Sequence, residues 1–183
     1  MVKKAKKDKG KCKAAAGGAS GSATDAASLL EQAQQHMDSL DLGAAIGVYQ
    51  QILAAEPDNH AALDRLAEAC LQAGEHDHAL AALQHSVALR PEGAAERYMN
   101  LGQLHEGAEA VGWFERGVGV LRAALAKVAG TGRELEATHA LAAALSTTAE
   151  IFLTDACEEP DAEARCEALA GEALSLVAAL EKQ

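Results

Sequence analysis

Residues 45–57 read AIGVYQQILAAEP, and residues 79–91, 34 positions later, read ALAALQHSVALRP. Each stretch places a small residue, a large apolar residue four positions on and a proline eight positions beyond it, as in Ala45, Tyr49 and Pro57. The same offset relates other pairs of residues: Leu29 with Leu63, Ala33 with Ala67, Gln50 with Gln84 and Ala54 with Ala88. A fixed period of this length predicts stacked structural units instead of a single irregular core.

Each unit reads as two helices joined by a turn. In the second unit a first apolar series follows the 3.6-residue period of an α-helix, Gly74 supplies a turn, and a second series resumes before Arg90 and Pro91 end the unit. The two series consist of Leu63, Leu66, Ala67 and Cys70, and of Ala79, Leu83 and Val87. Residues 26–93 resemble the tetratricopeptide repeat in this pattern. The resemblance implies antiparallel helix pairs that stack into a solenoid with a concave surface.

The composition agrees with an all-helical chain. Of the 183 residues, 49% are apolar but only 3% are aromatic, so alanine and leucine must provide most of the packing. Few β-branched runs occur, which argues against a sandwich or a barrel. No stretch is apolar over the 18 or so residues that a membrane span needs, and the N-terminus lacks the apolar core of a secretory signal. We therefore expect a soluble, intracellular, all-α protein.

The units after residue 93 depart from the regular period. The first helix of the third unit matches the second unit at an offset of 35, but Ala110 matches Ala79 at an offset of 31, so four residues are missing between the helices. We expect a right-handed solenoid of about four helical hairpins, with the third pair shortened and the fourth lengthened. Thr131 and Glu134 have capping-box spacing for the next helix. The predicted boundaries are a tail at 1–23 and units at 24–57, 58–93, 94–130 and 131–183.

Charge is distributed unevenly along the chain. The predicted tail holds seven lysines and one acidic residue, whereas positions 14–183 hold 9 basic and 26 acidic residues, a formal charge of −17. A strongly acidic body repels nucleic acid and anionic lipid and attracts cationic partners. The basic cluster is interpreted as a nuclear-import signal, with a polyanion contact or a solubilising end as alternatives. Its lysines are Lys3, Lys4, Lys6, Lys7, Lys9, Lys11 and Lys13.

No pattern of catalytic or metal-binding residues stands out. The sequence has no phosphate-binding glycine loop, nucleophile elbow or repeated acid pair, so we expect no enzyme activity and no cofactor. His76 and His78 follow Gly74, so we expect them in an inter-helix turn. Residues two apart also do not share a helix face, so we expect no metal there. Trp113 and Phe114 are interpreted as core residues, with a partner-binding anchor as the alternative.

Two segments carry a more specific resemblance. Residues 98–107 read YMNLGQLHEG, and residues 150–167 read EIFLTDACEEPDAEARCE. Together they resemble the family of dedicated assembly chaperones of ribosomal large-subunit protein four, over roughly residues 25–175. The resemblance implies that the chain binds this newly made protein through its long basic internal loop and escorts it into the nucleus. Members of the family carry further helical repeats and an acidic C-terminal region, from which this chain departs by ending at Gln183.

Candidate client-binding residues follow from the helical period. If the apolar series of the second unit points inward, a neighbouring stripe spaced by four and three residues faces the concave surface. The stripe consists of Asp64, Glu68 and Leu71 in the second unit, and of Glu96, Met99, Gln103 and Glu106 in the third. Carboxylates mixed with apolar anchors suit a client that is rich in lysine and arginine. Such carboxylates are also common on helix faces that merely contact solvent.

A general tetratricopeptide adaptor is the alternative, including a co-chaperone that grips the acidic C-terminal tail of a heat-shock protein. That function needs lysine, arginine and asparagine on the concave face to hold a carboxylate. The first two units offer only Arg65, and Asn59 beside a turn. We therefore expect a basic ribosomal protein as the partner, with an import receptor at the lysine cluster, no direct nucleic acid and no membrane. The expected location is the cytoplasm and the nucleus.

Overall fold

A computed structural model describes the backbone of residues 22–180 and the side chains of residues 25–180. This part of the chain contains eight helices and no strand. The helices are α1 (Ser22–Asp38), α2 (Leu42–Ala55), α3 (His60–Ala73), α4 (His76–Leu89), α5 (Glu96–Gln103), α6 (Gly107–Val128), α7 (Glu134–Leu153) and α8 (Ala162–Leu180). The predicted tail and its lysines lie outside the described residues, except that α1 begins at Ser22, inside the predicted tail.

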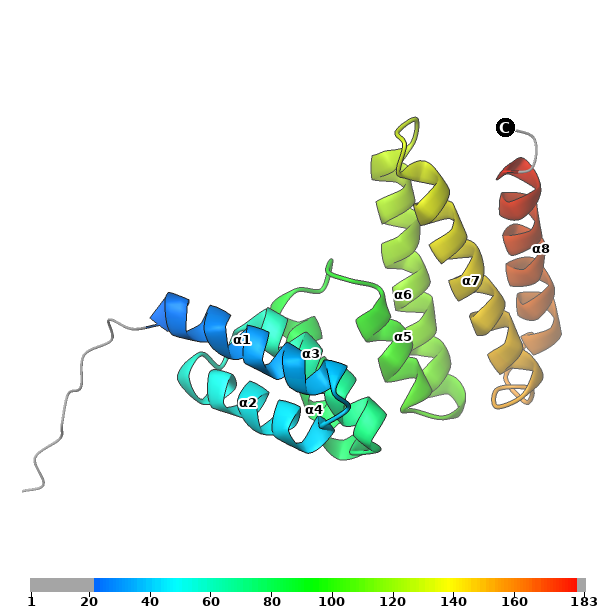
Figure 1. Ribbon diagram of the computed structural model, residues 1–183. Coiled ribbons are helices and arrows are strands. Elements are labelled where there is room, and N and C mark those ends of the chain that lie inside the picture. Colours follow the sequence, from blue (N-terminus) through cyan, green and yellow to red (C-terminus); the bar gives the residue numbers. More distant parts are fainter. Residues whose placement is uncertain (1–21, 181–183) are drawn as a thin grey trace, which may run out of the picture.

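The helices form four consecutive antiparallel pairs that stack along the chain. Figure 1 shows α1 to α4 as one group and α5 to α8 as a second group whose helix axes are steeply inclined to the first. In the third pair α5 has only 8 residues, and in the fourth pair the helices have 20 and 19 residues, against 14 in α2, α3 and α4. The expected all-α helical solenoid is confirmed, and the fourth pair is long, but the third pair is not shortened as a whole, because α6 has 22 residues and offsets the short α5.

Local sequence signals set several helix ends. The side-chain carboxylate of Asp41 accepts a hydrogen bond from the backbone N–H of Ala44 at 3.2 Å, and the Asn59 side chain accepts one from Ala62 at 3.1 Å. Both residues are N-caps that satisfy a free donor in the first helical turn. Gly74 ends α3 in the left-handed region, with φ at +76°, where a side chain would be strained.

Two local expectations were wrong. His76 and His78 do not lie in a turn, because α4 already begins at His76. Thr131 is not the N-cap of the next helix, because α7 begins at Glu134 after Arg133. The Glu134 carboxylate instead accepts a hydrogen bond from the backbone N–H of Gly130 at 2.6 Å, which closes the turn before the helix.

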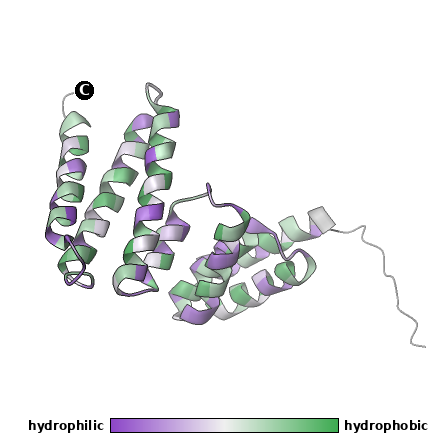
Figure 2. Cartoon of the chain, turned by 180° about the vertical axis from the view of Figure 1, so that it is seen from behind, coloured by the Kyte–Doolittle hydropathy of each residue, from purple (hydrophilic) through white to green (hydrophobic). Residues whose placement is uncertain are grey.

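The apolar core changes partners at the third pair. The first cluster extends from α1 to α4 and takes in Leu101 of α5. One further cluster joins Val118 of α6 to Leu145 of α7 and to α8, and another joins Val111 of α6 to Phe152 of α7 and to α8. Figure 2 shows apolar and polar residues interspersed along each helix, as amphipathic helices require. The third pair therefore joins two groups of helices with separate apolar interiors.

Two glycines allow α5 and α6 to approach closely. A Cβ atom on Gly102 would lie 2.6 Å from the Phe114 ring, and one on Gly117 would lie 3.1 Å from the Cβ of Tyr98. By contrast, a Cβ atom on Gly112 would meet nothing within 4 Å. Close packing thus explains Gly117 in the middle of α6 but not Gly112.

In residues 22–180 no helix is both long enough and apolar enough to span a bilayer. The same residues contain no group of three or more histidine, cysteine, aspartate or glutamate side chains placed to hold a metal ion.

Candidate functional site

Two adjoining hollows lie along the helices that begin the second, third and fourth pairs. The first hollow, of about 370 Å³, lies between α3 and α5 and is lined by Asp64, Glu68, Leu83, Ala94, Glu96, Arg97 and Asn100. The second, of about 220 Å³, lies between α5 and α7 and is lined by Glu96, Met99 and Gln103 of α5, by Ala95 just before that helix, and by Leu121 of α6. Both hollows are lined by Glu96, so they adjoin at this residue, and the two together are called the groove below.

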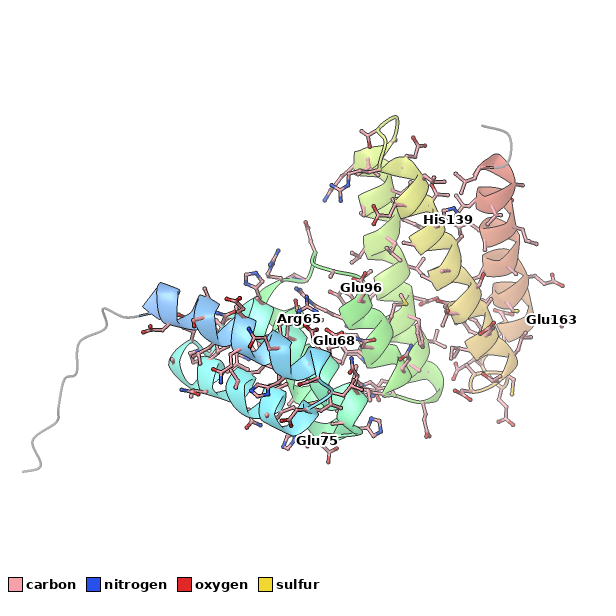
Figure 3. The ribbon with its side chains drawn as sticks, viewed as in Figure 1. Arg65, Glu68, Glu75, Glu96, His139 and Glu163 are labelled. Carbon is pink, nitrogen blue, oxygen red and sulfur yellow. The ribbon has the colours of Figure 1, made fainter. Side chains whose placement is uncertain are left out.

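The groove brings together five of the seven predicted client-binding residues. Figure 3 shows Glu68 and Glu96 at the inner angle between the two groups of helices, with Arg65 beside them. The two remaining predicted residues do not line either hollow. Leu71 is half-buried against the first core cluster, and Glu106 is exposed at the residue that precedes α6.

Asp64 has a structural partner that the sequence did not predict. One of its carboxylate oxygens accepts a hydrogen bond from the Arg97 guanidinium at 2.7 Å, and the other accepts one from the Ser86 hydroxyl at 2.6 Å. The Arg97 side chain is only 6% exposed, and it also donates to the backbone carbonyl of Arg90 at 3.3 Å. Because a buried guanidinium already neutralises it, the Asp64 carboxylate attracts an external cation less than an unpaired one would.

The Arg97 network joins the two groups of helices where the apolar core is interrupted. It links Asp64 on α3 and Ser86 on α4 to α5, and the Tyr98 hydroxyl adds a hydrogen bond to the backbone carbonyl of Pro91 at 2.6 Å. Gly93 leaves room for the guanidinium, since a Cβ atom there would collide with it. One donor of Arg97, the Nε–H group, is buried and has no acceptor among the described residues. The hydrogen-bonded ion pair of Arg97 and Asp64 therefore forms part of the wall of the first hollow.

The two glutamates of the groove are more available than Asp64. Glu68 is exposed, and its partner is the exposed Arg65 at 2.9 Å, one turn away on the same helix. Glu96 is exposed, and no ion pair to it is found within residues 25–180. Exposed pairs of this kind contribute only about 0 to 1 kcal/mol and exchange readily. An incoming lysine or arginine could therefore reach both carboxylates at little cost.

The second hollow is mainly apolar. Met99 is half-buried against the cluster that contains Val118 and Leu145, and Gln103 is exposed at the rim. The wall from α7 consists of small side chains: Ala140, Ala143, Ala144 and Thr147. The groove thus combines carboxylates at one end with a smooth apolar surface at the other.

Arg97, Asn100 and the alanines of α7 are groove residues that the sequence reasoning missed. Arg97 stands 35 positions after Ala62, which is fully buried in α3. An arginine at a position equivalent to a core residue was a usable signal for a buried ion pair. The α7 residues carried no signal, because alanine is common throughout this chain.

Two ion pairs bridge α6 and α8 across α7. The Arg122 guanidinium donates to both carboxylate oxygens of Glu172, at 3.0 and 2.5 Å, and Arg165 pairs with Glu115. The hydrogen bond that Arg122 donates to Glu172 is the main reason why the pKa of Arg122 is raised. Both arginines line a separate hollow of about 240 Å³, where their charges are already matched.

Comparison with known proteins agrees with this architecture. Residues 36–104 match the tetratricopeptide repeat model. The chain is 35% identical over 164 residues to the "Probable assembly chaperone of rpl4" of Emericella nidulans, an alignment that covers 82% of this chain and 40% of that protein. The chain therefore spans less than half the length of this relative.

Solved structures show the same fold. The "Assembly Chaperone of RpL4 (Acl4) (Residues 1-338)" superposes with a TM-score of 0.70 at 28% identity, covering 82% of this chain and 62% of that chain. The Sgt2 TPR domain from Aspergillus fumigatus superposes with a TM-score of 0.53 at 19% identity, covering 74% and 85% of the two chains, and shows the fold alone. Sequence and structure together show that this chain is a tetratricopeptide-repeat protein related to the assembly chaperones of rpl4.

Proposed function

We propose that this chain is a dedicated chaperone that binds a newly made, basic ribosomal protein of the large subunit, of the rpl4 type, in the groove. The observation that carries the proposal is the pairing of exposed carboxylates with an apolar hollow, in a chain related to proteins named for rpl4 assembly. A basic polypeptide that also carries apolar side chains matches both ends of the groove. The proposal is one of binding, and it needs no catalysis and no cofactor.

Electrostatics would act mainly through the summed charge of the body. The formal charge of −17 over positions 14–183 raises the local concentration of a cationic client and speeds its encounter. Individual contacts to Glu68 and Glu96 are worth about 0 to 1 kcal/mol each, so the apolar contacts around Met99 must supply the remaining affinity. Binding of this kind weakens as salt screens the charges.

Escort to the nucleus would use the lysine cluster at residues 3–13, which offers a basic signal to an import receptor. The protein would then be present in the cytoplasm, where the client is made, and in the nucleus, where ribosomes assemble. The location of a green fluorescent fusion of the chain tests this step. Fusions with the seven lysines changed to glutamine should remain cytoplasmic, and continued nuclear accumulation would refute this step.

A co-chaperone that holds an acidic peptide tail fits the groove less well. Such a function needs free cationic groups, but Arg65 and Arg97, the cations at the groove, are both paired with carboxylates. The Asn59 side chain serves as the N-cap of α3. The two cations at the groove are thus already paired, which leaves the uncharged Asn100 side chain on the wall of the first hollow as the remaining donor of this class there.

The test is a titration with a fluorescein-labelled synthetic peptide that copies the basic internal loop of large-subunit protein four. We expect Glu68→Gln with Glu96→Gln to weaken binding about three- to tenfold at low salt, since two exposed charge contacts are lost. The matched control is Glu163→Gln with Glu167→Gln, two exposed carboxylates of α8, of which Figure 3 shows Glu163 far from the groove. Equal losses in both variants, or no binding by the unaltered chain, would refute the proposal.

A further inference from the structure

The lysine cluster is a basic segment that belongs to the same chain as the acidic groove. Seven lysines lie within residues 3–13, and residues 14–21, which read AAAGGASG, connect them to the start of α1 at Ser22. Residues 1–21 lie outside the described part of the chain. Their sequence nevertheless has the two properties that the proposed client has, namely many positive charges and a peptide backbone.

The connection is long enough for the lysines to reach the groove. Eight residues span at most about 29 Å when extended, and α1, with 17 residues, is about 25 Å long. Figure 1 places the start of α1 at the outer end of the first group of helices, from where α1 runs toward the side on which α5 lies. Lysines at several positions of the cluster could therefore lie over α3 and α5.

The groove also has the chemistry to hold this segment. Glu68 and Glu96 are exposed carboxylates on its rim. The second hollow adds an apolar wall of small side chains beside Met99. Carboxylates beside an apolar wall fit the ammonium group and the aliphatic stem of a lysine side chain better than a free cation.

We propose that residues 3–13 occupy the groove of the same molecule when no client is bound, and that the client displaces them. This inference rests on the proposed function, because it assigns the same groove to both occupants. Tethering supplies an effective concentration in the millimolar range, so even a weak contact is substantially populated. Client binding would then free the lysines, and the import signal would be available mainly on loaded molecules.

The direct test is zero-length cross-linking of the full chain with a carbodiimide, which joins lysine ammonium groups to nearby carboxylates. Mass spectrometry should find Lys3 to Lys13 joined to Glu68 and Glu96 more often than to Glu163 and Glu167. An excess of the unlabelled basic client peptide should remove these links. Even distribution of the links between the groove and α8 would overturn the proposal. In a mixture of heavy and light chains, links between different chains would also overturn it, by assigning the segment to a second copy.

A competition measurement separates docking from a general charge effect. Changing all seven lysines to glutamine should tighten binding of the labelled client peptide about three- to tenfold at 25 mM salt, because the tethered competitor is gone. This gain should vanish in the Glu68→Gln, Glu96→Gln background and persist in the Glu163→Gln, Glu167→Gln background. An equal gain in both backgrounds would show a field effect alone and overturn the proposal. If the peptide binds neither form of the chain, the proposed function fails, whereas the cross-links still report on the segment.

Discussion

Replacing Arg97 with alanine should destabilise the protein by about 2–3 kcal/mol. The substitution leaves the Asp64 carboxylate without its cation, and removing one partner of a buried ion pair costs about 3–5 kcal/mol. The Asp64 side chain is 33% exposed and keeps its bond from Ser86, so water and the hydroxyl recover part of that cost. The expected loss is therefore lower than for a fully buried pair, but well above that for a surface residue.

The matched control is Arg65→Ala. Arg65 also pairs with a glutamate at 2.9 Å, but both side chains are about half exposed, so we expect a loss below about 0.5 kcal/mol. Urea unfolding followed by tryptophan fluorescence measures both, because Trp113 is the single tryptophan and its ring centroid lies 6.2 Å from that of Tyr98, the neighbour of Arg97. Equal losses for Arg97→Ala and Arg65→Ala would refute the view that the buried pair joins the two groups of helices.

Two further outcomes follow from packing and burial. Gly102→Ala should destabilise the protein by about 1–3 kcal/mol, because the added methyl group meets the Phe114 ring. Gly112→Ala, in open space on α6, should instead stabilise it by up to about 1 kcal/mol. Thermal unfolding measures both changes, and the same sign for both would contradict the geometry. Burial raises the pKa of the Cys70 thiol to about 11. Between pH 9 and 11 the folded state therefore keeps the thiol proton that the unfolded state loses. The free energy of unfolding should fall by at most about 2–3 kcal/mol over this range. Urea unfolding at those pH values tests this, with Cys70→Ala as the control that should reduce the fall by this amount; burial also raises the pKa of Tyr49, so its phenol contributes to the fall that remains.

The repeat period made the fold predictable, because each unit uses the same few contacts. Ala45, Tyr49, Ala79 and Leu83 are all buried, as their matched positions imply. The same logic located the carboxylates of α3 and α5, since a stripe beside a known core stripe has a fixed direction on a helix. Helix ends were harder: the first turn of α4 was placed in a loop because histidine and aspartate give no strong helix signal.

The partners of charged side chains could not be read from the period. Asp64 was assigned to a client, although Arg97, 33 positions later, holds it in a buried pair. That pair depends on how α5 crosses α3, which the irregular spacing of the third unit hides. Whether Glu106 contacts a client stays a prediction, because it lies outside both hollows and its surroundings give it no assigned role.

The ion pairs between α6 and α8 have a mechanical consequence. Glu115 and Arg122 are seven residues apart on α6, and their partners Arg165 and Glu172 are seven apart on α8, so the two bridges, two turns apart, favour one axial register of these helices. Their side chains are 36–51% exposed, so each bridge adds only about 0 to 1 kcal/mol to the cohesion that the shared apolar clusters supply. We expect α6, α7 and α8 to move together as one unit, with any hinge motion on the side of α5.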